Sequence, residues 1–197
     1  MDFRFNPEDH SYFLDGEQLP SVTDICSLLS GRISVNDAVL QHAARRGITV
    51  HELCELIDYD VFLEDIEVEP ELAGYVLSYV RFLRDYKPEW KMVEQKLFSS
   101  GFGFAGTLDR YGTIDGKPTI VDIKTTEGAS KATKIGWACQ LAGYATLLGE
   151  SEARLWILQL SKSGKYRIIQ AEDVQSKYKF DAFALFHQLR EIKQILM

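Results

Sequence analysis

Three ionisable residues lie where a β-hairpin is expected, and their types and spacing could hold a metal ion. Residues 106–126 read GTLDRYGTIDGKPTIVDIKTT, in which Asp115–Gly116 is typical of a two-residue hairpin loop. If these two residues form the loop, Asp109 faces Asp122 at a closely spaced pair, with Cα atoms about 4.5 Å apart. Lys124 lies two residues beyond Asp122 and therefore on the same face of its strand.

Two carboxylates that meet in this way repel each other, so one pKa rises unless a cation lies between them. A divalent metal ion is the simplest solution, and oxygen ligands favour Mg²⁺ or Mn²⁺ over zinc. Lys124 beside such an ion could orient a water nucleophile or offset phosphate charge. The alternative is that Asp122 and Lys124 form an ordinary ion pair on an exposed face.

The composition is that of a globular domain, which could carry these residues inside a sheet. The chain has 197 residues, of which 46% are hydrophobic and 26% charged. It contains no apolar run of about 20 residues, and its first residues lack the pattern of a secretory signal. It has only three cysteines, which are too few for an iron–sulfur cluster held by four. We therefore expect a cytoplasmic protein without a membrane segment.

The net charge of −7 is unevenly distributed. Eight acids and no Lys or Arg lie in 55–71, whereas nine Lys or Arg and five acids lie in 110–167. These may be read as two ordinary solvated faces or as a basic rim around an acidic centre, which would suit a polyanion held near a metal. In the second interpretation, the candidates for nucleic-acid contacts are Arg110, Lys131 and Lys134.

The elements that must position these residues follow from turn signals and periodicity. Ser21 or Thr23 is expected to cap the first helix, and Gly47 to break the second helical region. The predicted elements are a β-meander over 3–19, helices over about 22–29 and 34–59, an amphipathic helix over 71–86, strands over 90–99, 103–114 and 117–124, a helix over 134–149, a hairpin within 153–171 and a helix over 173–196. No repeat or linker interrupts this order, which indicates one domain.

Four motifs occur in an order that resembles the PD-(D/E)XK nuclease superfamily, and most closely its RecB-like and phage-type exonuclease branch. They are RRGITVHELCE, GTLD, VDIKTT and QLAGY, and the resemblance covers about 45–160. It implies an α/β fold with a restriction-endonuclease-like core, a mixed central β-sheet flanked by helices. The expected division of the single domain 1–197 is a meander and helix over 1–35, the nuclease core over 45–160, and a strand and helix over 161–197.

The resemblance also implies roles for individual residues. Asp109, Asp122 and Lys124 would be catalytic, and Gln140 and Tyr144 would line the nucleic-acid path and brace the site. The metal ligands would be His51, Asp109, Asp122 and the backbone carbonyl of Ile123. Glu55, one helical turn after His51, and Glu94, on the strand before Asp109, are further candidates.

The expected function is a deoxyribonuclease that uses Mg²⁺ or Mn²⁺. An exonuclease on DNA ends or single strands, in recombination, repair or phage DNA processing, is the first choice, and a structure-specific endonuclease the second. A non-catalytic nucleic-acid-binding accessory protein is the rival. A hydrolase of small phosphate esters is disfavoured, because the chain has no Gly-rich phosphate cradle. The chain has no G-x-x-x-x-G-K-[ST] motif, so it is not itself a motor, and delivery of the DNA by a helicase or recombinase partner is left open. The oligomeric state is open.

Overall fold

The computed structural model describes residues 1–27, 37–61, 68–126 and 131–171, together with 181, 183, 184, 187 and 188. Its elements are β1 (Phe3–Asn6), β2 (Ser11–Leu14), β3 (Glu17–Leu19), α1 (Val22–Cys26), α2 (Asp37–Asp58), α3 (Ala73–Tyr86), β4 (Glu89–Ser99), β5 (Phe104–Ile114), β6 (Lys117–Lys124), α4 (Lys131–Leu148), β7 (Arg154–Leu160) and β8 (Tyr166–Gln170). Among the described residues, no helix combines the length and the apolar character needed to cross a membrane.

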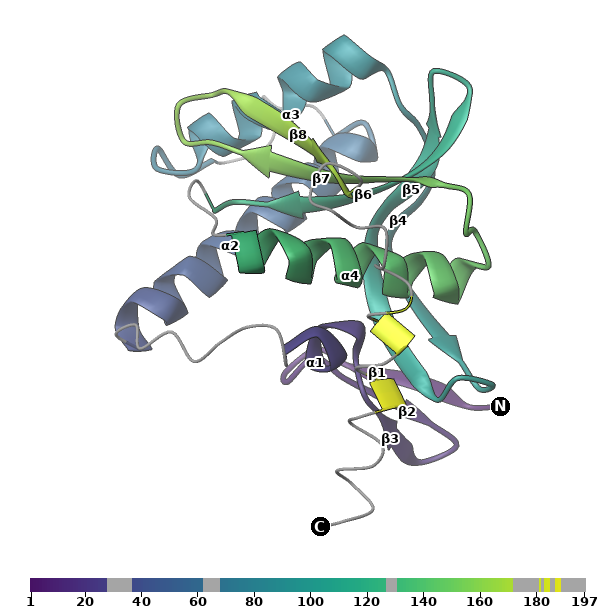
Figure 1. The fold of residues 1–197 in the computed structure, drawn as a ribbon. Coiled ribbons are helices and arrows are strands. Elements are labelled where there is room, and N and C mark those ends of the chain that lie inside the picture. The colour runs from purple at the N-terminus through teal and green to yellow at the C-terminus, as the bar shows by residue number, and fades with distance from the viewer. Residues whose placement is uncertain are drawn as a thin grey trace.

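A mixed sheet with helices on both faces forms the centre of the molecule (Figure 1). Its strand order is β4-β5-β6-β7-β8, and the β6–β7 pair is parallel whereas the other pairs are antiparallel. One core packs α1 and α4 against the sheet, with Leu141 and Leu155 fully buried. The other packs α2 and α3 against the opposite face, with Val50 and Phe82 fully buried. The order α3-β4-β5-β6-α4-β7 is the predicted one.

The hairpin of β5 and β6 has the register that its turn residues predict. Pairing runs from Ile114 opposite Lys117 to Arg110 opposite Val121, and both loop residues have positive φ, +49° at Asp115 and +70° at Gly116. The same register, continued by one residue, places Asp109 opposite Asp122. There the Asp109 side chain enters the ladder, because its Oδ2 accepts a hydrogen bond from the backbone N–H of Ile123 at 2.7 Å.

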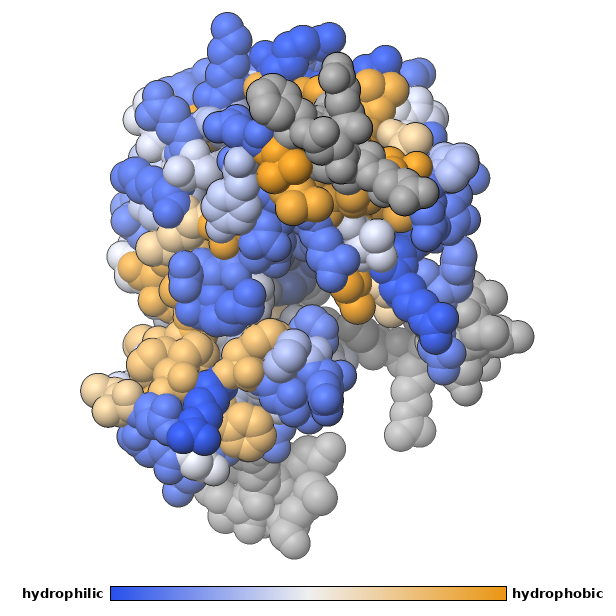
Figure 2. Space-filling model, turned by 180° about the vertical axis from the view of Figure 1, so that it is seen from behind, coloured by the Kyte–Doolittle hydropathy of each residue, from blue (hydrophilic) through white to orange (hydrophobic). Residues whose placement is uncertain are grey.

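The predicted N-terminal meander is a separate three-stranded sheet, β1-β2-β3, that packs on the end of the β4–β5 hairpin. Tyr12 and Thr107 share a hydrogen bond of 2.8 Å, and the rings of Phe3 and Phe98 stack with centroids 4.5 Å apart. Ser21 caps α1 with a capping box that includes Asp24, as one of the two expected caps. Seen from behind, apolar side chains gather on this lower part, and the surface is hollowed between it and the main body (Figure 2).

The predicted break at Gly47 is wrong, because α2 runs without interruption from Asp37 to Asp58. A glycine inside a helix costs only about 1 kcal/mol, and buried Val50, Leu53 and Cys54 anchor the following turns in the core. Helix α1 also ends earlier than expected, at Cys26. Most of the predicted helix over 173–196 lies outside the described residues.

Candidate metal centre and active site

Three side chains from three elements converge at one end of the sheet. His51 of α2, Glu94 of β4 and Asp109 of β5 each offer a ligand atom, and these atoms all lie within 4.8 Å of one another. Nδ1 of His51 is 3.2 Å from Oε1 of Glu94 and 3.7 Å from Oδ2 of Asp109. The other ring nitrogen, Nε2, is 3.1 Å from the backbone carbonyl oxygen of Ile123. The predicted candidates His51, Asp109, Glu94 and Ile123 are therefore neighbours in space.

The local structure explains why these groups meet. His51 follows buried Val50 and precedes buried Leu53 and Cys54, so the packing of α2 turns its ring towards the end of the sheet. Glu94 lies in a strand but has φ of +45°, a left-handed conformation that is rare for such a residue and costs of order 1–3 kcal/mol. Surrounding contacts must hold this conformation, and it turns Glu94 towards His51.

Asp122 and Lys124 form a second group beside the first. The Asp122 side chain is 1% exposed, and its Oδ2 is 2.8 Å from Nζ of Lys124. That contact lacks hydrogen-bond geometry, so neither Asp122 oxygen has a hydrogen-bond partner among the described residues. Lys124 balances the charge, but buried oxygens without hydrogen bonds remain costly unless a donor or a further cation completes their coordination. The orphaned oxygens therefore fit a metal ligand, although Asp122 lies outside the group formed by His51, Glu94 and Asp109.

Gln140 and Tyr144 support Lys124 from α4. Nζ of Lys124 donates to Oε1 of Gln140 at 3.2 Å, and Nε2 of Gln140 donates to the Tyr144 hydroxyl at 3.0 Å. The same amide nitrogen lies 3.4 Å from Oγ1 of Thr23 in α1. Because Gln140 and Tyr144 are one helical turn apart, both reach the same side of α4. Gln140 contacts the amine and Tyr144 contacts Gln140, so their geometry is that of a brace for Lys124.

The charges of the site shift several pKa values. Burial alone would lower the pKa of His51, but the carboxylates of Asp109 and Glu94 outweigh it and raise that pKa to about 9. Burial raises the pKa of Asp109 to about 7, with His51 opposing the shift and Asp122 adding to it. For Lys124 the penalty of burial is outweighed by Asp122 and Asp109, which raise its pKa.

A protonated His51 also agrees with its contacts, since both ring nitrogens face acceptors, a carboxylate and a carbonyl. In the absence of a metal ion, the imidazolium supplies the positive charge that the carboxylates require. A metal ion bound there would replace this proton, because only a neutral imidazole can act as a ligand.

Arg110 was predicted to contact nucleic acid, but its side chain is buried. Its side chain is 0% exposed, with Nε 2.5 Å from Oδ2 of Asp58 and Nη1 2.8 Å from Oε1 of Glu94. Asp58 accepts further hydrogen bonds from the Tyr79 hydroxyl and the Trp90 indole. The expectation that Arg110 contacts nucleic acid is not supported, because a fully buried guanidinium in two ion pairs has no access to a phosphate. It anchors Glu94 instead.

Three of the predicted site residues remain: Glu55, Lys134 and Lys131. Glu55 lines a cavity of about 340 Å³ that also exposes His51, Glu94 and Asp109, so it is near the site without belonging to the three-residue group. Lys134 is half-buried in α4. Lys131 begins α4, and its side chain lies outside what the structure describes.

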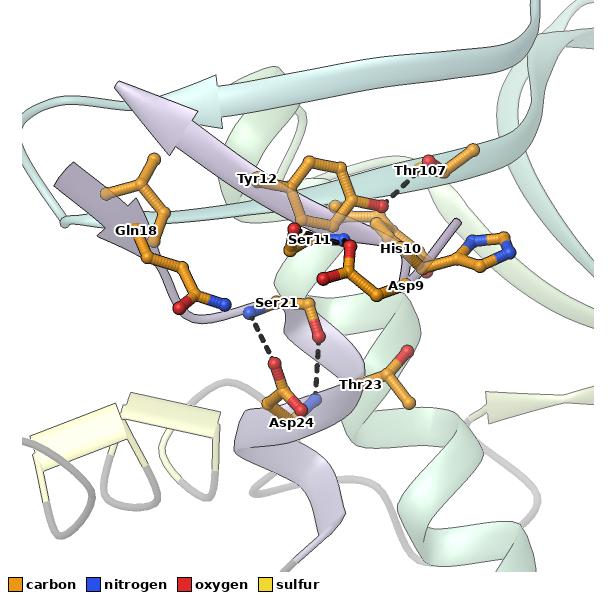
Figure 3. A pocket seen from close by; sticks show the side chains of 12 residues that line it. Asp9, His10, Ser11, Tyr12, Gln18, Ser21, Thr23, Asp24 and Thr107 are labelled. Carbon is orange, nitrogen blue, oxygen red and sulfur yellow. Dashed lines mark hydrogen bonds between the residues drawn. The ribbon is translucent and has the colours of Figure 1, made fainter. Parts of the chain in front are cut away.

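Sequence reasoning missed two parts of the site. One is Asp58 with Tyr79, which hold Arg110 from α2 and α3; their spacing carries no motif that could have revealed them. The other is the N-terminal sheet, whose Phe5 and His10 line the cavity at the metal centre. A second cavity of about 470 Å³ lies beside the contact between this sheet and β5, where Tyr12 meets Thr107 (Figure 3). Tyr144 of α4 also lines it.

The fold and site define the class of the protein. It is a mixed α/β protein with a restriction-endonuclease-like core, whose central sheet carries a His/Glu/Asp group that could bind a metal ion. A family model of the PD-(D/E)XK nuclease superfamily matches residues 29–196, so the chain belongs to that superfamily. The match is consistent with the RecB-like branch. Membership implies a nuclease with a nucleic-acid substrate and, as is usual in this superfamily, divalent metal ions. The comparison with curated proteins gave no match.

Proposed function

We propose that the protein is a deoxyribonuclease that hydrolyses phosphodiester bonds with Mg²⁺ or Mn²⁺. The preferred form of this proposal is an exonuclease that acts on DNA ends or single strands. The observation that carries this proposal is the convergence of His51, Glu94 and Asp109 within 4.8 Å, beside the buried Asp122–Lys124 pair. Oxygen and imidazole ligands of this kind suit Mg²⁺ or Mn²⁺.

Each group has a separate task in this proposal. His51, Asp109, Asp122 and the carbonyl of Ile123, with Glu94 as a further candidate, would hold the ion, which when bound supplies Lewis acidity and lowers the pKa of a water molecule. Lys124 would orient the attacking water and offset the negative charge that develops on the phosphate. Gln140, fixed by Tyr144, limits the positions that the amine can take.

The test is cleavage of end-labelled linear, flapped and single-stranded DNA in Mg²⁺, Mn²⁺ or EDTA. We expect metal-dependent shortening from an end, lost in EDTA and in Asp122→Asn. Asp115→Asn is the matched control, because this exposed Asp lies in the hairpin loop of the same strands, where Asn tolerates positive φ. Internal scission would favour the structure-specific endonuclease, and binding without cleavage on every substrate would favour the non-catalytic accessory protein. Delivery of the DNA by a helicase or recombinase remains a prediction from the family.

A further inference from the structure

A row of polar side chains crosses the sheet from Lys124 to the edge strand β8. Lys124 of β6 lies opposite Gln159 of β7, and Gln159 lies opposite Arg167 of β8. Residues that lie opposite each other on neighbouring strands share a face of the sheet, so Arg167 is on the face of Lys124. Neighbouring strands are about 4.8 Å apart, which places the backbones of Lys124 and Arg167 about 10 Å apart. The turn between β7 and β8 also lies at the same end of the sheet as the start of α4 (Figure 1).

Gln159 fixes the middle of this row. Its side chain is buried, and its Nε2 donates a hydrogen bond to the backbone carbonyl oxygen of Thr126 at 2.6 Å. This bond holds the chain that follows Lys124 against β7. The three side chains of the row carry two positive charges and no negative charge, so the row favours a polyanion.

Arg167 has a second cation beside it, Lys165. Both side chains are exposed, and together with Gln159 they line a cavity of about 300 Å³. Neither cation has an ion pair or a side-chain hydrogen bond among the described residues. Tyr166, which lies between them in the sequence, packs against the core on the opposite face and donates to Asp85 of α3 at 2.7 Å. The two cations are therefore available to a ligand.

The charge of this cavity differs from that of the two cavities described above. The cavity of about 470 Å³ is lined by Asp9 and Asp24, and the cavity at His51 is lined by the carboxylates of the metal centre. Among the described residues that form the cavity of about 300 Å³, none is acidic, and the charged ones are Lys165 and Arg167. A phosphate group there meets cations without a competing anion.

We propose that Lys165 and Arg167 bind the sugar–phosphate backbone of the DNA strand being cleaved, a few nucleotides from the bond that is broken. This proposal rests on the proposed nuclease function and deepens it. Phosphates recur about every 3.4 Å along each strand of a duplex, so the separation of about 10 Å between Lys124 and Arg167 spans three phosphates or fewer. Contacts to phosphates position a strand without reading its sequence. The strand then crosses the end of the sheet from the metal centre towards β8.

The salt dependence of DNA binding measures these contacts without cleavage. In EDTA, the fluorescence anisotropy of a labelled oligothymidylate gives the affinity of the full chain at about 50 and 200 mM salt. Each phosphate contact to a single strand contributes about 0.7 to the slope of log affinity against log salt. The loss of affinity over this four-fold change in salt should therefore be about 2.6 times smaller in Arg167→Gln or Lys165→Gln than in the wild type. In the double variant it should be about 7 times smaller.

Lys117→Gln is the matched control. Lys117 is also an exposed cation of the central sheet, but it begins β6, whereas Lys124 ends it. Its replacement removes the same charge at the far end of the strand, so the slope should stay that of the wild type.

A wild-type slope in Arg167→Gln and Lys165→Gln, an equal fall of the slope in Lys117→Gln, or no measurable binding of the oligonucleotide would each overturn the proposed surface. These results would leave metal-dependent cleavage untouched, so the nuclease proposal is judged separately by the end-labelled substrates. Conversely, a protein whose slope falls in both variants but that cleaves no DNA would retain this surface and refute the nuclease.

Discussion

Replacing Arg110 with Ala is the sharpest perturbation of the fold. Its guanidinium pairs with Glu94 of the candidate metal centre and with Asp58 of α2. The side chain is 0% exposed and contacts Asp58, which is 1% exposed, and Glu94. It also donates to the backbone carbonyl of Asp109 at 2.7 Å. In the variant, Asp58 keeps only the neutral donors of Tyr79 and Trp90, so its charge stays buried without a counter-ion.

The expected loss of stability is large. Removing one partner of a buried ion pair costs about 3–5 kcal/mol, since it leaves the other charge uncompensated. With a urea dependence of about 2 kcal/mol/M, this corresponds to a fall of about 1.5–2.5 M in the unfolding midpoint. The matched control is Arg84→Ala, which removes an exposed pair with Asp85 and should cost at most about 1 kcal/mol.

Urea unfolding followed by circular dichroism measures both variants against the wild type. If Arg110→Ala does not fold, Tyr79→Phe removes only the hydroxyl that donates to Asp58 and should cost about 1–3 kcal/mol. A midpoint for Arg110→Ala that is no lower than that of Arg84→Ala would refute the reasoning. So would an unchanged midpoint for Tyr79→Phe.

Three further predictions address the site and the sheet. Asp122→Asn should abolish DNA cleavage while the fold is retained, because Asn keeps the shape of the side chain but removes the charge that would hold the metal ion; near-normal turnover would exclude its role. In the metal-free protein, protonated His51 should contribute stability that is complete below its ordinary pKa of 6.5 and lost as the pH rises through about 9. The apparent Mn²⁺ affinity, measured by calorimetry, should rise over the same interval, and a flat profile would contradict this. Gly112→Ala should destabilise the β4–β5 pair by about 1–3 kcal/mol in thermal unfolding, because its Cβ would meet the backbone oxygen of Glu89; a melting temperature equal to that of the wild type would count against it.

The parts of the fold that the sequence predicts are those set by local signals. The Asp115–Gly116 loop determines the register of β5 and β6, because two residues with positive φ permit only one pairing. The amphipathic stripe of α3 and the turn at 163–164 place their elements within a few residues. The same local register brings Asp109 and Asp122 to opposed positions. The motif spacing then adds His51, which no local rule would bring to this sheet.

The parts that the sequence does not predict depend on tertiary contacts. Gly47 weakens a helix by only about 1 kcal/mol, and the buried Val50, Leu53 and Cys54 that follow it hold α2 against the core. Arg110 has the charge of a phosphate contact, and only the positions of Asp58 and Glu94 show that it is buried. The cavity of about 470 Å³ arises where the small N-terminal sheet meets β5, so no single segment contains its pattern. Burial and partners, rather than residue type, decide these roles.

The distribution of charge in the site explains why three carboxylates can remain inside this sheet. Each buried anion is matched by a cation from a different element: Glu94 by Arg110, Asp122 by Lys124, and Asp109 by the protonated His51. Arg110 and Lys124 have raised pKa values and stay charged at neutral pH. His51 is the exception, since an imidazole can give up its proton near neutral pH far more readily than either of the others. A divalent ion that displaces this proton changes the local charge by only +1, so the fold can accept the metal without losing the balance that stabilises it.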